Sequence, residues 1–256
     1  MTDELPVQVD RGQGPPVVLL HGLGNNFRSW TYVLEKFDGT RNRVIALDLL
    51  GFGDAPKPDH VRYTVDDHAD AVIATLDRLG VVGATVAGHS MGCLVAARVA
   101  LERDDLVSRL VLLGSPVFRR ITLRRNPLTF WERESTYLRI FRFISEQPDL
   151  TLTAAEGLDT FAPMVKGMEI TEETWPAFTM SLENTIMQTT GYADLLRLTQ
   201  PTELVYGKLD AFVISRNLRA AARHNRSLVY STLLGPHEIS PLEGQTIADL
   251  LQHTQG

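Results

Sequence analysis

The chain has 256 residues, of which 44% are hydrophobic and 22% charged, and its formal net charge is −6 at pH 7. This length and composition predict a globular protein with one large α/β domain and room for an inserted subdomain. The negative charge argues against a nucleic-acid partner, because binding phosphates needs a basic face. The single cysteine, Cys93, excludes an intrachain disulfide and a cysteine-rich zinc site.

The sequence shows no export signal and no membrane segment. Its first ten residues, MTDELPVQVD, are acidic and lack the apolar centre of a secretory signal. No apolar run approaches the roughly 18 residues that a membrane-spanning helix needs. We therefore expect a soluble, cytoplasmic protein with no membrane partner.

Short apolar runs that end in glycine, histidine or aspartate recur along the chain. They predict strands at 16–21 (PVVLLH), 43–47 (RVIAL), 84–88 (ATVAG), 109–114 (RLVLLG), 202–207 (TELVYG) and 227–234 (SLVYSTLL). Helical patterns lie between most of them, at 64–80, 91–103, 213–224 and 243–253. In the first helix Thr64 and Asp67 resemble a capping box, and Gly80 ends the pattern. The alternation predicts a mostly parallel sheet flanked by helices on both faces.

Residues 116 to about 200 break this alternation. They contain no convincing strand but several helical segments, such as 135–145 and 177–188. Because the stretch lies between two predicted strands, we expect a helical insertion over the sheet. The predicted domains are an α/β core made of 1–115 and 201–256 and a helical insertion at 116–200.

The sequence VAGHSMGCLVAARVA (86–100) joins a predicted strand to a predicted helix without a loop. In this context Gly88-x-Ser90-x-Gly92 is typical of a nucleophile elbow. The tight turn would strain the backbone of Ser90, and the two glycines would keep side chains out of the crease. We expect Ser90 to project from the C-terminal edge of the sheet as a nucleophile. The alternative is a tight turn that happens to hold a serine.

A serine nucleophile needs a general base, and His237 is the candidate among the seven histidines. It follows a predicted strand and precedes the last helix, so it can reach the same edge of the sheet. Asp210, in the loop after the strand at 202–207, is the candidate for the carboxylate that orients the base. The alternative role for Asp210 is to cap the helix that begins near Val213.

The oxyanion of an acyl-transfer reaction needs hydrogen-bond donors. One should be the backbone N–H of Met91, directly after the nucleophile. The second should come from the glycine-rich loop HGLGNNFRSW (21–30), and we assign it to the N–H of Leu23. Gly22 permits close approach of the backbone there. The alternative for this loop is an ordinary strand-to-helix turn.

With HGLG, DLLGFGDAPKP (48–58), GHSMG, GKLD and GPHE in this order, nearly the whole chain resembles the α/β-hydrolase family. The resemblance implies a Ser–His–Asp triad, an acyl-enzyme mechanism and no cofactor or metal. It likens the insertion at 116–200 to the family's cap domain. One departure is Asp54, which stands where the family often has the serine of a Gly-x-Gly-x-Ser loop.

The predicted function is hydrolysis of a small acyl ester by Ser90, and two alternatives stay open. One is a carbon–carbon bond hydrolase of ring-cleavage products, although that subfamily often has tryptophan where this chain has Glu238, and tends to have a longer oxyanion loop. The other is a non-catalytic receptor for a small ligand on the same fold. Epoxide hydrolases and haloalkane dehalogenases carry an aspartate nucleophile, so Ser90 counts against both. The oligomeric state is not indicated.

Two groups of side chains in the insertion are candidates for contacts with the substrate. The candidates for an apolar pocket are Phe130, Trp131, Phe141, Phe161, Met164, Met168, Trp175, Phe178 and Met180. The alternative for each of them is packing within the insertion or against the sheet. The candidates for steering a carboxylate-bearing substrate are Arg119, Arg120, Arg124, Arg125, Arg133, Arg139 and Arg142. The alternative for these arginines is a set of solvated helix faces.

Overall fold

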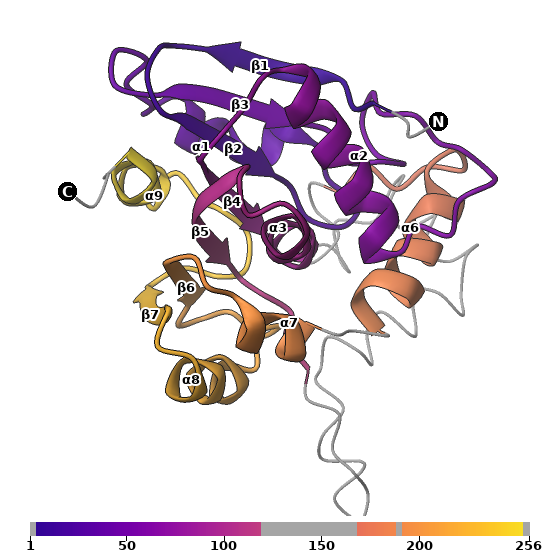
Figure 1. Cartoon of the computed structure of the whole chain (residues 1–256). Helices are drawn as coiled ribbons and strands as arrows, with labels where there is room; N and C mark the ends of the chain where they lie inside the picture. Colours follow the sequence, from indigo (N-terminus) through magenta and orange to yellow (C-terminus); the bar gives the residue numbers. More distant parts are fainter. Residues whose placement is uncertain (1–3, 119–167, 188–190, 253–256) are drawn as a thin grey trace, which may run out of the picture.

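A computed structural model describes residues 4–118, 168–187 and 191–252 of the chain (Figure 1). Its strands are β1 (Val7–Arg11), β2 (Pro16–Leu20), β3 (Arg43–Leu47), β4 (Ala84–His89), β5 (Val107–Leu113), β6 (Thr202–Gly207) and β7 (Leu228–Leu233). Within the described residues they form one sheet in the order β1-β3-β2-β4-β5-β6-β7. Only β1 pairs antiparallel, with β3, and the other neighbours are parallel. The predicted mostly parallel sheet is confirmed.

The helical segments alternate with the strands. They are η1 (Phe27–Trp30), α1 (Thr31–Leu34), α2 (Val65–Arg78), α3 (Met91–Glu102), α6 (Trp175–Ser181), η3 (Leu182–Met187, a π-helix), α7 (Gly191–Arg197), α8 (Ser215–His224) and α9 (Gly244–Gln252). The capping box predicted for α2 is present: the Thr64 hydroxyl accepts from the Asp67 amide at 3.1 Å, and the Asp67 carboxylate accepts from the Thr64 amide at 2.8 Å.

Strand side chains alternate between two hydrophobic cores, as a pleated strand requires. On β2, Val18 and Leu20 pack in the core beneath α2, α3 and α8. Val17 and Leu19 pack on the opposite face, beneath α1 and α9. The helices therefore cover both faces of the sheet, as Figure 1 shows.

The strand β1 was not predicted. Its sequence, VQVDR, alternates apolar and polar residues over only five positions, and it lies at the edge of the sheet. It is held to β3 by backbone pairing and by a bidentate ion pair in which the Arg43 guanidinium donates to the Asp10 carboxylate, both at 2.7 Å. A short, half-exposed edge strand carries a weak periodicity signal.

Of the described residues of the insertion, 175–187 and 191–197 are helical, which agrees with the prediction over 177–187, and they pack on the core. The Thr185 hydroxyl donates to the carbonyl of Tyr63 at 2.7 Å, and the Ser181 hydroxyl lies 3.0 Å from His68 Nε2 on α2. The segment 135–145 lies outside the described residues. No helix in the described part of the chain combines the length and the hydropathy needed to cross a membrane.

Candidate active site

Ser90 occupies the single turn between β4 and α3 and has strained backbone angles, with φ 53° and ψ −119°. A side chain larger than hydrogen at Gly88 would overlap the backbone of Gly92, and one at Gly92 would overlap the carbonyl of Leu20. The Ser90 amide donates to the carbonyl of Leu113 at 2.8 Å. The strain and the need for both flanking glycines match the elbow expected from the sequence.

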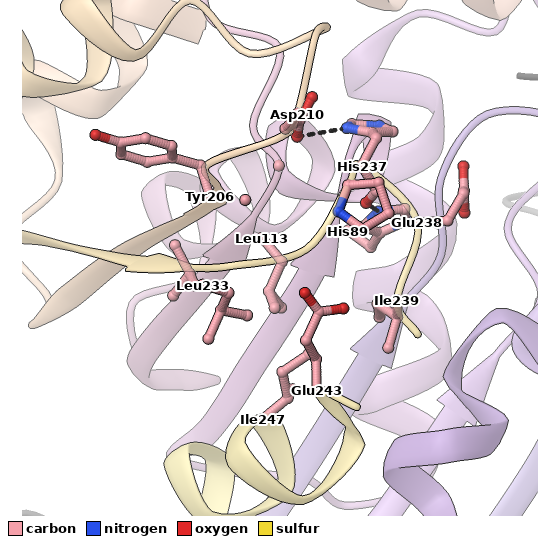
Figure 2. Close-up of a pocket in the computed structure, with 14 residues that line it drawn as sticks. His89, Leu113, Tyr206, Asp210, Leu233, His237, Glu238, Ile239, Glu243 and Ile247 are labelled. Carbon is pink, nitrogen blue, oxygen red and sulfur yellow. Dashed lines mark hydrogen bonds and ion pairs between the residues drawn. The ribbon is translucent and has the colours of Figure 1, made fainter. Parts of the chain in front are cut away.

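Asp210 and His237 are hydrogen-bonded to each other at the ends of neighbouring strands. His237 Nδ1 lies 2.8 Å from Asp210 Oδ2, the dashed line in Figure 2. Because a carboxylate only accepts, Nδ1 carries the proton and Nε2 of the neutral ring is an acceptor. The Asp210 side chain is 1% exposed and that of His237 9%, so water competes little with this bond. This is the geometry that an oriented general base requires.

The alternative role of Asp210, as the cap of a helix beginning near Val213, is wrong, because α8 begins at Ser215 and its N-cap is Ile214. The Oδ1 atom of Asp210 instead accepts from the loop amides of Phe212 at 2.8 Å and Val213 at 3.2 Å, while Oδ2 binds His237. Burial alone would raise the pKa of this carboxyl group. The bond and charge of His237, together with the two amides, outweigh burial and hold the pKa of Asp210 below its ordinary value.

Gly114 links the elbow to the Asp–His pair. It follows Leu113, whose carbonyl accepts from the Ser90 amide. A Cβ on Gly114 would lie 3.0 Å from His237 Cε1 and 3.5 Å from Asp210 Oδ2. The three residues predicted from the sequence therefore lie at the same edge of the sheet. Sequence reasoning missed Gly114, although its place directly after a buried strand was visible.

The loop after β2 approaches the nucleophile closely. A Cβ on Gly22 would lie 3.0 Å from Ser90 Cβ, so only glycine fits without displacement. Leu23 is 2% exposed, and no acceptor for its N–H is found among the described residues. Met91 is the first residue of α3, so its N–H has no acceptor one helical turn earlier. Both amides are available to an oxyanion.

His21 fixes the loop that carries Leu23. Its Nε2 accepts from the Leu49 amide at 2.8 Å, so Nδ1 carries the proton and donates to the Gly22 carbonyl at 2.7 Å. Burial lowers the pKa of His21 to about 4, which keeps the ring neutral and both bonds intact at neutral pH. Sequence reasoning placed His21 at the turn but did not assign it this role.

Asp48 connects the loop 48–58 to the loop that follows β2. Its buried carboxylate accepts from the amides of Phe27 at 2.8 Å and Asp54 at 3.0 Å, and from Gln8 Nε2 at 2.9 Å. Asp54, the departure from the family pattern, accepts from the same Gln8 amide group at 2.9 Å. The aspartate at position 54 therefore takes part in a local polar network.

The insertion reaches the loop after β2 at Gly24. The Glu169 amide donates to the Gly24 carbonyl at 2.6 Å, and a Cβ on Gly24 would lie 3.2 Å from the Phe178 ring and 3.4 Å from Met168 Cβ. Phe178 is fully buried and stacks on Trp175, so the packing alternative describes it. Met180 is 38% exposed. The remaining pocket candidates, Phe130, Trp131, Phe141, Phe161 and Met164, and all seven candidate arginines lie outside the described residues.

A small cavity of about 20 Å³ lies beside His237. It has room for about one water molecule. His89, Leu113, Tyr206, Ile239 and Glu243 are among the residues that line it (Figure 2). Over the described ranges, no group of three or more His, Cys, Asp or Glu side chains is placed to hold a metal ion.

The sequence was also compared with known protein families and characterised proteins. The family described as alpha/beta hydrolase fold matches the chain over residues 15–239. The chain is 34% identical over 134 residues to a haloalkane dehalogenase of Mycolicibacterium paratuberculosis, covering 50% of this chain and 41% of the relative. It is 36% identical over 109 residues to a 2-hydroxymuconate semialdehyde hydrolase of Pseudomonas sp. strain CF600, covering 41% and 38%. The chain thus spans less than half the length of these curated relatives.

Among solved structures, an esterase from Exiguobacterium antarcticum superposes with a TM-score of 0.76. The two sequences are 19% identical, and the superposition covers 96% of this chain and 93% of the esterase. At this identity the likeness concerns the fold.

Proposed function

Because the chain belongs to the α/β-hydrolase fold family, we propose that it is a serine hydrolase of small carboxylic esters. The observation that carries the proposal is the hydrogen bond of 2.8 Å between His237 and Asp210, formed beside an elbow that strains Ser90. A surface histidine with no catalytic role would not need a buried carboxylate partner. The arrangement supplies a nucleophile, a base and an orienting acid.

In the proposed mechanism Ser90 Oγ attacks the ester carbonyl while His237 Nε2 takes the hydroxyl proton. The Nδ1 proton stays on the ring, and the charge of Asp210 stabilises the imidazolium that forms. His237 then gives its proton to the leaving alcohol. An acyl group remains on Ser90, and water activated by His237 releases the acid and regenerates the serine.

The amides of Leu23 and Met91 hold the negative oxygen that forms in each step. Each is worth about 3 kcal/mol of transition-state stabilisation if it behaves as measured oxyanion donors do. The bonds that His21 makes to Gly22 and Leu49 support this role, because a donor stabilises a transition state best when it is already in place.

The proposal includes a division of the chain into a catalytic core and a cap. Residues 1–115 and 201–256 form the catalytic core, and the insertion at 116–200 acts as a cap over the site. The contacts of Glu169, Met168 and Phe178 with Gly24 support this, since they bring the insertion against the loop that offers the Leu23 amide. An apolar cap predicts that butyrate and hexanoate esters are cleaved faster than acetate.

A second candidate function is hydrolysis of a carbon–carbon bond in a ring-cleavage product. The 36% identity to a 2-hydroxymuconate semialdehyde hydrolase favours it, and it would use the same residues on a vinylogous diketone. The likeness to a haloalkane dehalogenase does not favour dehalogenation, because Ser90 stands where those enzymes have an aspartate.

Turnover of p-nitrophenyl acetate, butyrate and hexanoate, beside a 2-hydroxy-6-oxo-hexadienoate, tests both functions. We expect ester hydrolysis that disappears in Ser90→Ala and His237→Ala. Preference for the dienoate by more than about tenfold in kcat/KM would select the second function. A folded protein that hydrolyses neither substrate and is not labelled by a fluorophosphonate would contradict both, and would fit a ligand receptor.

A further inference from the structure

His89, the last residue of β4, touches several parts of the proposed catalytic site, although the mechanism above gives it no step. Its side chain is 1% exposed. Its Nε2 lies 2.9 Å from the backbone carbonyl oxygen of His237, and the two ring centroids are 5.0 Å apart (Figure 2). It also directly precedes Ser90 in the chain. One buried ring therefore contacts the base and adjoins the nucleophile.

The contacts define the tautomer of His89. A carbonyl only accepts, so Nε2 carries the proton and donates it to His237. Nδ1 is then an acceptor, and it is buried without a hydrogen-bond partner among the described residues. Burial lowers the pKa of His89, which keeps the ring neutral. A buried polar atom without a partner is unfavourable, so burial of this ring carries a free-energy cost.

The two nitrogens of His89 face different parts of the site. A Cβ on Gly22 would lie 3.3 Å from Nδ1, so this edge of the ring faces the loop that carries Leu23. Trp30 packs edge-on against the ring at a centroid distance of 6.5 Å. The His89 ring thus lies between the loop after β2 and the loop that carries His237, and it contacts both.

The loop that carries His237 also contacts Glu243. The Glu243 carboxylate accepts from the amide and hydroxyl of Ser240, and any side chain at Gly235 would overlap it. Between these supports lies the cavity of about 20 Å³ that His89, His237 and Glu243 line. The His237 loop is therefore not packed tightly on the side of the cavity, and the hydrogen bond from His89 restrains the His237 backbone there.

We propose that His89 is a positioning residue, whose Nε2–H fixes the His237 backbone so that the imidazole stays aligned between Asp210 and Ser90. This inference rests on the proposed function. Misplacement of a catalytic group by about 1 Å costs about 10²-fold in rate. Loss of the bond should therefore lower kcat and leave substrate binding nearly unchanged.

The test compares His89→Leu, which has no donor, with His89→Gln, whose amide nitrogen reaches about as far as Nε2. We expect His89→Leu to lower kcat for p-nitrophenyl butyrate by about 10²-fold with KM within twofold of wild type. His89→Gln should recover most of the loss. Trp30→Phe is the matched control, because it disturbs the packing of the same ring without removing a bond to His237.

Melting temperatures and fluorophosphonate labelling of Ser90 accompany the kinetics. A kcat loss in His89→Leu at a melting temperature similar to that of Trp30→Phe supports positioning. Equal kcat losses in the Leu and Gln variants, or in Trp30→Phe, would reduce His89 to a packing residue. If His89→Leu does not fold, His89→Asn replaces it, since its shorter amide cannot reach the His237 carbonyl.

The outcomes separate this inference from the function on which it rests. An active wild type beside an equally active His89→Leu or His89→Asn variant would overturn the positioning role alone. A wild type that neither hydrolyses esters or the dienoate nor labels with fluorophosphonate would overturn the proposed function, and the role of His89 with it.

Discussion

The amide of Glu169 donates a hydrogen bond of 2.6 Å to the carbonyl of Gly24, across 145 positions of sequence. Gly24 directly follows Leu23, whose amide we assign to the oxyanion hole. The bond makes the shape of that loop depend on the insertion. If the insertion binds substrate as proposed, its contacts can therefore change the position of the proposed oxyanion donor.

Gly24→Ala tests this dependence, with Gly83→Ala as the matched control. Both glycines have left-handed backbones, with φ of 67° and 64°, so alanine strains both by about 1 kcal/mol. Only at Gly24 would the new methyl group press on Phe178 and Met168, since nothing lies within 4 Å at Gly83. We expect Gly24→Ala to lower kcat/KM by about tenfold, or 1.4 kcal/mol, and Gly83→Ala to lower it less than twofold. If Gly24→Ala and Gly83→Ala lower kcat/KM equally, the contact between the insertion and the loop does not affect catalysis.

Asp210→Asn and Asp210→Ala separate the two bonds of the Asp210 side chain. Asparagine keeps an oxygen for the amides of Phe212 and Val213 but presents a donor or a weaker acceptor to His237. We expect kcat to fall by about 10⁴-fold in Asp210→Asn with little loss of stability. Asp210→Ala should lose activity similarly and, because the amides of Phe212 and Val213 lose their acceptor, about 1 kcal/mol of unfolding free energy in addition. Steady-state kinetics measure kcat, and urea denaturation measures the free energy of unfolding. A kcat of Asp210→Asn close to that of wild type would mean that another residue is the catalytic acid.

Two neutral buried histidines should make the fold sensitive to acid. Burial lowers the pKa of His21 to about 4 and that of His68 to about 3, against about 6.5 in an unfolded chain. Between these values and 6.5 the unfolded chain binds protons that the folded chain does not. Stability is therefore fully present above pH 6.5 and falls as the pH drops, by about 1.4 kcal/mol per pH unit for each histidine.

His68→Gln isolates one of these contributions, because glutamine does not titrate and can still pair with Ser181. Urea denaturation between pH 7 and 4 should give a flatter pH dependence in the variant, by about 1.4 kcal/mol per pH unit well below pH 6.5. Parallel curves for the variant and wild type would show that His68 takes up its proton in the folded state.

A buried ion pair between α3 and α7 should contribute to the stability of the fold. Arg98 of α3 donates to Asp194 of α7 at 2.9 Å and also pairs with Asp66 of α2, and the Asp194 side chain is 6% exposed. Asp194→Ala leaves the Arg98 guanidinium without one of its partners in a buried site. Because Arg98 keeps its bond to Asp66, we expect the free energy of unfolding to fall by about 2 kcal/mol, the contribution of one charge-assisted hydrogen bond.

Asp105→Ala is the surface counterpart of Asp194→Ala. Asp105 pairs with Arg103 at 2.8 Å, but its side chain is 51% exposed. An exposed pair is screened by water and salt, so this variant should unfold at nearly the wild-type urea concentration. If both variants unfold alike, burial does not strengthen the Arg98 contact.

The sequence predicted most of the sheet because its central strands are buried on both faces. An apolar run as short as RVIAL, ended by an aspartate, is typical of a buried strand, and β3 and β6 begin and end where predicted. The edge strand β1 escaped prediction because half of it faces water. The four residues of α1 are too few for a helical period to show.

The candidate site was predictable where chemistry restricts the residue type. Ser90, Asp210 and His237 stand out because nucleophile, acid and base each need a particular side chain after a strand. Gly114 and His89 could not be found in this way, because their importance lies in distances to residues far away in the chain. Long-range contacts of this kind appear only once the strands are placed in order.

The location of Cys93 has a practical consequence for spectroscopy. The chain's only thiol lies under the elbow, 1% exposed, with Sγ 3.1 Å from the Gly88 carbonyl oxygen and 3.2 Å from that of Leu113. Burial also raises its pKa, which suppresses the reactive thiolate. Maleimide dyes should therefore leave the native chain unmodified. A cysteine introduced at Met180, which is 38% exposed, would carry a single fluorophore on the insertion without any need to remove the natural thiol.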